Sequence, residues 1–88
     1  MTTPSAHTLR VLYFAAARDR AQTQEEQISL PYPHTLAELK RCLYSKHVAL
    51  APLDQYLRWA VNHSFCEDEE MILHEGDEVA LIPPISGG

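Results

Sequence analysis

The 88-residue sequence has few of the features that mark secreted, membrane or metal-binding proteins. Its two cysteines, Cys42 and Cys66, form no C-x-x-C pair, so we interpret them as half-buried thiols rather than parts of a disulfide framework or zinc ribbon. The five histidines show no metal-ligand spacing. No apolar run approaches the roughly 20 residues of a membrane span, and residues 1–6 do not resemble a signal peptide. These absences predict a cytoplasmic protein without a metal site or membrane contact.

Basic residues are absent from the last thirty positions. All seven Lys and Arg residues lie in the first 58 positions beside five acids, whereas the last thirty positions hold seven acids, and the net charge is −5. This asymmetry argues against nucleic acid as a partner and favours a basic protein surface, because opposite fields speed docking. Simple solubility is the alternative interpretation.

The first third of the chain predicts two strands. Residues 8–14 are aliphatic and aromatic with a single charge, which is typical of a central strand. Residues 15–20 favour a helix by propensity, but six residues are too few for a stable one, so we predict a loop or a single turn. Residues 25–30 alternate weakly, as an edge strand does, and Pro31-Tyr32-Pro33 ends them.

A helix is predicted to begin after Thr35. Thr35 and Glu38 form a capping box, and an apolar stripe follows at Leu36, Leu39 and Leu43. Residues 48–52 then read as an irregular apolar connection.

Shorter strands fill the rest of the chain. Residues 56–61 alternate with period two and predict a strand, Asn62-His63 a turn, and residues 64–66 a short strand. The acidic residues 67–70 are expected in solvent, and residues 71–73 as a small apolar plug. Gly76 supplies a tight turn before residues 78–82, whose apolar run is typical of a strand covered on both faces.

This order of elements predicts an α+β domain of the β-grasp, or ubiquitin-like, type. Strands 8–14 and 78–82 are expected to lie side by side and parallel in the centre of a mixed sheet that grips one main helix. The predicted organisation is a flexible N-terminus over residues 1–7, a β-grasp domain over 8–82 and an extended C-terminal tail over 83–88.

The predicted tail is stiff where it leaves the domain and thin where it ends. Pro83 and Pro84 fix φ and favour an extended course, whereas Gly87 and Gly88 have no side chain to clash with their surroundings. Such an arm is suited to insertion into the active site of another protein. A frayed terminus is the alternative.

Several motifs together resemble the small, ubiquitin-like sulfur-carrier subunits of molybdopterin synthase. They are residues 11–15 followed by Arg18-Asp19, the run 60–62, the block 76–80, and the diproline and Ser-Gly-Gly of the tail. The closing block is specific because the turn, strand, diproline and diglycine occur in register.

The resemblance implies a group-transfer role for Gly88. In the family, an adenylating enzyme related to ubiquitin activators uses ATP to convert the terminal carboxylate to an acyl-adenylate, and a sulfur donor turns this into a thiocarboxylate. The tail then enters the large subunit of a heterotetrameric synthase and delivers sulfur to cyclic pyranopterin monophosphate. No tightly bound cofactor is implied, and the acid and base groups are expected on the partner.

The resemblance and the position of the predicted tail together assign the site residues. Gly88 would carry the sulfur, and Gly87, Ser86, Pro84 and Pro83 would thread the tail. Partner contacts are predicted at Ile85, Ile82 and Phe14, with Glu75 and Glu78 steering the encounter. For Phe14 and Ile82, a place in the core is the alternative.

Two other functions remain open on the sequence. One is a sulfur carrier of the same fold that serves thiamine synthesis or tRNA thiolation. The other is a plain β-grasp binding module in which the tail is incidental.

Overall fold

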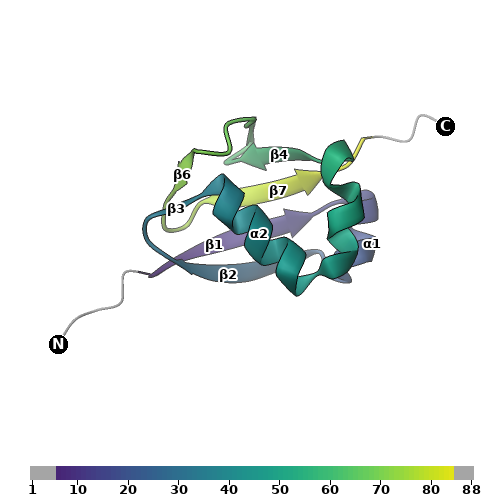
Figure 1. Cartoon of the computed structure of the whole chain (residues 1–88), viewed down its shortest axis with the longest axis horizontal. Helices are drawn as coiled ribbons and strands as arrows, with labels where there is room; N and C mark the ends of the chain where they lie inside the picture. The colour runs from purple at the N-terminus through teal and green to yellow at the C-terminus, as the bar shows by residue number, and fades with distance from the viewer. Residues whose placement is uncertain (1–5, 85–88) are drawn as a thin grey trace.

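The structure, a computed structural model, describes residues 6–84 and is built on a five-stranded mixed sheet (Figure 1). Its strands are β1 (Ala6–Tyr13), β2 (Glu25–Pro31), β4 (Arg58–Val61), β5 (Ser64–Phe65) and β7 (Glu78–Ile82). Their spatial order is β2-β1-β7-β4-β5. The β1 and β7 strands are parallel and the other pairs are antiparallel, which confirms the predicted parallel pair at the centre of a mixed sheet.

One face of the sheet is covered by the helix α2 (Leu36–Lys46). Its capping box is present as predicted: the Thr35 amide donates to Glu38 Oε1 at 2.8 Å, and the Glu38 amide donates to Thr35 Oγ1 at 3.2 Å. The predicted stripe of Leu36, Leu39 and Leu43 is at most 1% exposed. Burial of this stripe against the sheet holds the helix in place.

A second, two-stranded sheet lies at the end of the molecule where β1 begins (Figure 1). It pairs β3 (His34–Thr35) with β6 (Ile72–Leu73), so the predicted apolar plug is a short strand. The turn between β6 and β7 contains Gly76 at φ +82, and the Gly76 amide donates to the Thr8 carbonyl at 2.9 Å. The predicted glycine turn is therefore confirmed.

The prediction of a loop or a single turn at residues 15–20 is wrong, because the seven-residue helix α1 spans Ala15–Ala21. Ala17 and Ala21 are buried in the core, and Gln22 ends the helix in the left-handed conformation with its amide donating to the Arg18 carbonyl at 2.8 Å. A helix that is too short to persist alone is thus stabilised by packing and a C-cap.

The prediction of an irregular connection at residues 48–52 is also wrong, because a 3-10 helix, η1, spans Val48–Tyr56. The buried side chain of Leu50 anchors it, and it displaces the predicted start of the next strand from residue 56 to Arg58. The first strand differs as well: it begins at Ala6 rather than residue 8, since Ala6 and His7 pair with Pro31 and Leu30 of β2.

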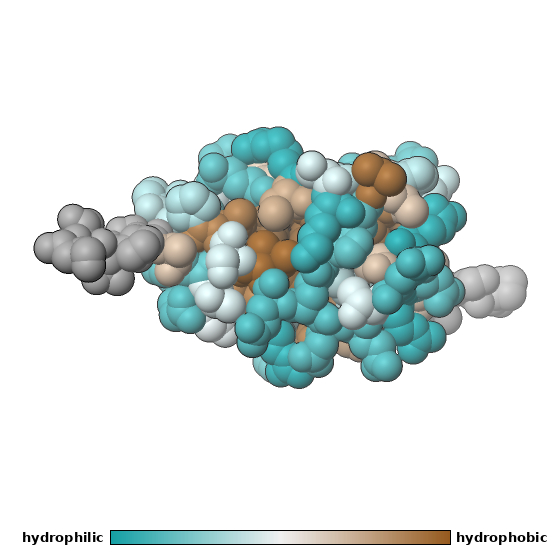
Figure 2. Space-filling model, turned by 90° about the horizontal axis from the view of Figure 1, so that it is seen from below, coloured by the Kyte–Doolittle hydropathy of each residue, from teal (hydrophilic) through white to brown (hydrophobic). Residues whose placement is uncertain are grey.

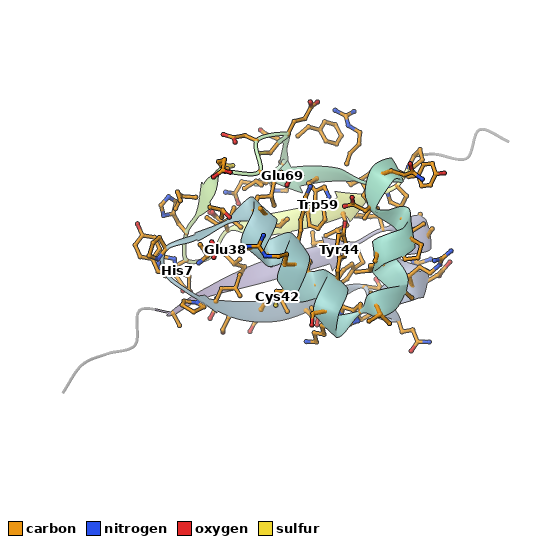
Figure 3. The ribbon with its side chains drawn as sticks, in the orientation of Figure 1. His7, Glu38, Cys42, Tyr44, Trp59 and Glu69 are labelled. Atoms are coloured by element: carbon orange, nitrogen blue, oxygen red, sulfur yellow. The ribbon has the colours of Figure 1, made fainter. Side chains whose placement is uncertain are left out.

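The core lies between α2 and the sheet. Figure 3 shows Tyr44 of α2 and Trp59 of β4 on this side, and their ring centroids are 6.3 Å apart. Alternate residues of the central strands complete the core, namely Leu9, Val11, Tyr13, Trp59, Val61, Val79 and Leu81. The strand pattern therefore sends one set of side chains to α2 and leaves the other set on the opposite face.

The β2 edge of the sheet is kept polar. Figure 2 views the molecule from below, the side on which β2 lies in Figure 1, and shows a mostly hydrophilic surface with smaller hydrophobic areas. Exposed Glu25 and Gln27 contribute to this edge. Charged residues on an edge strand oppose pairing with another sheet.

Candidate docking surface and tail root

The end of β7 is held on both sides by neighbouring strands. The Phe14 amide donates to the Leu81 carbonyl at 3.2 Å, and Ile82 is the cross-strand partner of Arg58. Pro83 is buried and Pro84 is exposed, so the chain changes from core to surface within two residues. We refer to Pro83 and Pro84 as the tail root. Ile85, Ser86, Gly87 and Gly88 lie outside the described residues, and their roles stay predictions.

Beside the tail root, the face of the sheet opposite α2 carries exposed apolar side chains. We call this the open face. Phe14 is 47% exposed and Phe65 is 54% exposed, and Ile82 is partly buried. The structure therefore brings the predicted contacts Phe14 and Ile82 together, and only Phe14 is clearly outside the core. Contiguous apolar surface of this kind marks interaction sites.

A hollow of about 310 Å³ is sunk into the open face. Its lining residues are Leu12, Phe14, Ala60, His63, Phe65, Glu78, Ala80 and Ile82. Ala60 and Ala80 are direct cross-strand partners on β4 and β7. Because two methyl groups stand where larger side chains surround them, the sheet surface is low at this point.

The hollow has one polar end, formed by Glu78. Its Oε1 lies 3.4 Å from Arg10 Nη1, and its Oε2 lies 3.6 Å from His63 Nε2. Arg10 is also bound to Glu25 at 3.0 Å, and this hydrogen bond raises the pKa of Arg10 and lowers the pKa of Glu25. A carboxylate with these two long contacts keeps lone pairs available to a further donor.

Glu75, the other acid predicted to contact a partner, does not join the hollow. Its Oε1 accepts from the Thr8 amide at 2.8 Å, in the turn that precedes β7. Glu75 and the tail root therefore lie at opposite ends of β7. Its role in steering stays a prediction.

A second cluster of titratable side chains surrounds Glu26, on the core side of the sheet. Glu26 Oε1 lies 2.7 Å from Lys46 Nζ, and Oε2 lies 2.6 Å from His47 Nε2 and also accepts from the Tyr13 hydroxyl. Burial alone raises the pKa of Glu26, but the hydrogen bonds from Lys46, Tyr13 and His47 outweigh it, so the pKa lies below its ordinary value. Burial, followed by the bond to Glu26, raises the pKa of Tyr13.

This cluster joins β1, β2 and the end of α2, and it contributes to stability. Tyr13 is 2% exposed, so the cluster offers no access for a substrate at that side chain. Within residues 6–84, no group of three or more His, Cys, Asp or Glu side chains is arranged to hold a metal ion. In the same range, no helix is long and apolar enough to cross a membrane.

A model of the ThiS family matches residues 11–88, which include both the open face and the tail root. The chain belongs to the ThiS family. Two relatives of this ThiS-family member are molybdopterin synthase sulfur carrier subunits. The protein from Drosophila yakuba is 39% identical, over 91% of this chain and 90% of the relative. That from Mycosarcoma maydis is 45% identical, over 98% of this chain and 96% of the relative.

Solved structures agree on the fold of this ThiS-family member. A Pyrococcus furiosus protein assigned to molybdopterin converting factor subunit 1 has a TM-score of 0.82 and 26% identity, covering 90% of this chain and 99% of that one. A chain from the Helicobacter pylori complex of subunits 1 and 2 of molybdopterin-converting factor has a TM-score of 0.70 and 22% identity, covering 92% of this chain and 99% of that one. The predicted β-grasp fold and the predicted resemblance are confirmed.

Several residues of the hollow were missed from the sequence. Phe65 was assigned to a short strand without a role, and Leu12, Ala60, His63 and Ala80 were not singled out. The signal that was available is the alternation of the strands: once Val79 and Leu81 face the core, Ala80 and Ile82 face the other way. The pairing of Ala60 with Ala80 needs the register, which the sequence does not give.

Proposed function

We propose that this chain is the sulfur carrier subunit of a molybdopterin synthase and that its Gly88 carboxylate is the group that carries sulfur. The observation that carries the proposal is the position of the tail root, which is anchored between two strands and adjoins an exposed apolar face. An anchored root fixes the point at which the tail leaves the domain, next to the open face that would hold a partner. The names of the relatives support the same role.

The proposed chemistry takes place on the terminal carboxylate. An adenylating enzyme joins it to AMP from ATP and releases pyrophosphate. A sulfur donor then displaces AMP and leaves a thiocarboxylate. Its sulfur bonds to cyclic pyranopterin monophosphate, and water then cleaves the acyl–sulfur bond and restores the carboxylate. This chain would supply the acyl group alone, and ATP would be a substrate of the activating enzyme rather than a resident cofactor.

In this proposal the open face docks the large subunit of the synthase. Apolar side chains that remain exposed in the free domain, with Phe14 and Phe65 foremost, gain burial only in a complex. The Helicobacter pylori complex of subunits 1 and 2 supports a two-subunit arrangement. We infer a heterotetramer in the cytoplasm, where the free thiols of Cys42 and Cys66 would stay reduced.

The test is intact-mass spectrometry after incubation with an adenylating enzyme, ATP and a sulfur source. The expected result is a mass increase equal to replacement of one oxygen by sulfur, which disappears in a variant that lacks Gly88. A matched circular-dichroism melt of the variant controls for folding. No mass increase on the native chain, or the same increase on the deletion variant, would contradict the proposal. Addition of the large subunit and pterin precursor then separates this role from other thiolation pathways.

A further inference from the structure

We propose that the hollow on the open face receives one amphipathic anchor from the large subunit, an aromatic side chain with a hydrogen-bond donor at its tip, such as Tyr or Trp. The inference rests on the proposed function, in which this face docks that subunit. It goes further by assigning the chemistry of the group that enters the hollow and the end at which its polar tip lies.

The size of the hollow fits a single large side chain. A volume of about 310 Å³ corresponds to roughly ten water molecules at about 30 Å³ each. That space is too small for a helix and larger than a methyl or isopropyl group requires. Ala60 and Ala80, which are 6% and 9% exposed, form its floor. Side chains larger than alanine at either position would fill it.

The walls of the hollow are apolar and one of them is held in place. Leu12 and Ile82 stand on the two central strands, and Phe14 and Phe65 stand at their flanks. The guanidinium carbon of Arg58 lies 3.8 Å from the centroid of the Phe65 ring. This cation–π contact orients the ring before a partner arrives, so less ordering remains for the complex. An aromatic or aliphatic body suits such walls.

The polar tip of the anchor is assigned to the Glu78 end. Among the lining residues only Glu78 and His63 are polar, and they lie 3.6 Å apart. The Glu78 side chain is 20% exposed, and a carboxylate accepts hydrogen bonds but donates none. A purely apolar anchor would leave this group without a new partner as water is removed. An anchor with a donor at its tip avoids that cost.

The occupant is the large subunit rather than a second copy of this chain. Ile82 lines the hollow and directly precedes Pro83, so a protein that receives the tail also covers the hollow. A second copy would bring another net charge of −5 against the first, with seven acids in its last thirty residues. Like fields oppose that contact.

The experiment is a calorimetric titration of the full chain with its cognate large subunit. Ala80→Leu fills the hollow, and we expect Kd to rise about 100-fold, the scale of a lost anchor. Gln27→Leu is the matched control: it adds the same side chain on the open face, next to Arg10 and outside the hollow, and we expect less than about a two-fold change. Thermal melts of both variants report folding.

A second pair of variants keeps the inference testable if Ala80→Leu fails to fold. Phe65→Ala removes a wall, with an expected rise in Kd of about 30-fold. Glu78→Gln removes the charge that faces the tip, and we expect about ten-fold faster dissociation, beyond any loss of steering that slows association. If Phe65→Ala, or a folded Ala80→Leu, binds as the native chain does, the anchor inference is overturned while the proposed function stands. If the native chain itself binds no large subunit, the proposed function fails.

Discussion

The two faces of the sheet come from the same strands and differ in what covers them. On the side of α2, Val79 and Leu81 are fully buried. On the open face, the next residues along the same strand, Ala80 and Ile82, border a hollow and exposed aromatic rings. The strand β7 thus supplies Val79 and Leu81 to the core. It supplies the small Ala80 and the partly buried Ile82 to the open face. Residues one position apart therefore serve the fold on one face and recognition on the other.

Because one face is covered and the other is not, substitutions on the core face should affect stability, and substitutions on the open face should affect binding. Apolar area that is already buried stabilises the domain by about 25 cal/mol per Å², and its loss is felt in unfolding. Apolar area that is still exposed contributes to a complex instead. Neighbouring residues of β7 therefore make the sharpest test of the comparison.

The largest loss of stability is expected from the single variant Leu81→Ala, and the single variant Ile82→Ala is its comparison. Leu81 is fully buried, so its truncation should lower the free energy of unfolding by about 2–5 kcal/mol. Ile82 is partly exposed, and its truncation should cost about 1 kcal/mol in stability yet weaken binding to the large subunit. Urea unfolding and calorimetry measure the two quantities. Equal losses of stability in both variants would contradict the division between the faces.

A second prediction concerns Glu26, whose cluster fastens α2 to the core face. Glu26→Gln should lower the free energy of unfolding by about 1.5–3 kcal/mol at neutral pH, the range for hydrogen bonds to a charged group. Because the folded-state pKa is lowered, this contribution is present above the unfolded pKa and is lost as pH falls through the folded pKa. The difference between native chain and variant should therefore shrink in acid.

The control for this prediction is Glu25→Gln, on the neighbouring position of β2 but paired with Arg10 in solvent. Chemical denaturation at a series of pH values from neutral to acid measures both variants. A Glu26→Gln deficit that stays constant through this range would show that the side chain acts by shape rather than by charge.

A smaller change in the free energy of unfolding, an increase rather than a loss, is expected at the turn between β4 and β5. Asn62 and His63 have φ values of +50° and +74°, which suits the Asn-Gly type of hairpin turn. His63→Gly should raise the free energy of unfolding by about 0.5–1 kcal/mol, since glycine adopts positive φ without the cost that a side chain incurs. Thermal unfolding measures it, and Ser64→Gly serves as a control that should destabilise.

Much of the fold could be predicted from local pattern. The capping box at Thr35, the leucine stripe of α2 and the glycine turn at Gly76 are signals confined to a few residues, and each is confirmed. The failures share a cause. α1 and η1 are too short to be stable alone and depend on Ala17, Ala21 and Leu50 being buried, which only the tertiary structure shows.

The candidate site could also be predicted in part, where position in the sequence was enough. Phe14 and Ile82 were identified because they stand beside the tail, and their positions on the open face agree with that. The hollow itself was not predictable, because it depends on Ala60 lying opposite Ala80 across two strands that are far apart in the chain. Alanine carries no functional signal in a sequence. Its role here is the space that it leaves.

The smallest expected effect is a change in association rate. It comes from the charges of the acidic loop at residues 67–70, in contrast to the contacts of the open face. Glu67 and Glu70 are exposed, and no ion pair involves either of them within residues 6–84. Asp77 is less suitable for a charge test, because it accepts from Asn62 Nδ2 at 3.0 Å and from the His74 amide at 2.8 Å and so holds the turn before β7. Removing Glu67 and Glu70 changes the field with little change in contacts.

If the acidic half of the chain steers docking, Glu67→Gln with Glu70→Gln should slow association with the large subunit about two- to three-fold at low salt. Dissociation should be unchanged, because exposed charges act mainly on the encounter. The difference should vanish as salt rises, since the Debye length is about 10 Å at 0.1 M. Stopped-flow association at low and high salt measures this, with Ala80→Leu as the opposite case, in which dissociation changes and salt has little influence. An association rate that responds neither to salt nor to these acids would make the acidic half a determinant of solubility, and the open face would then account for recognition without electrostatic help.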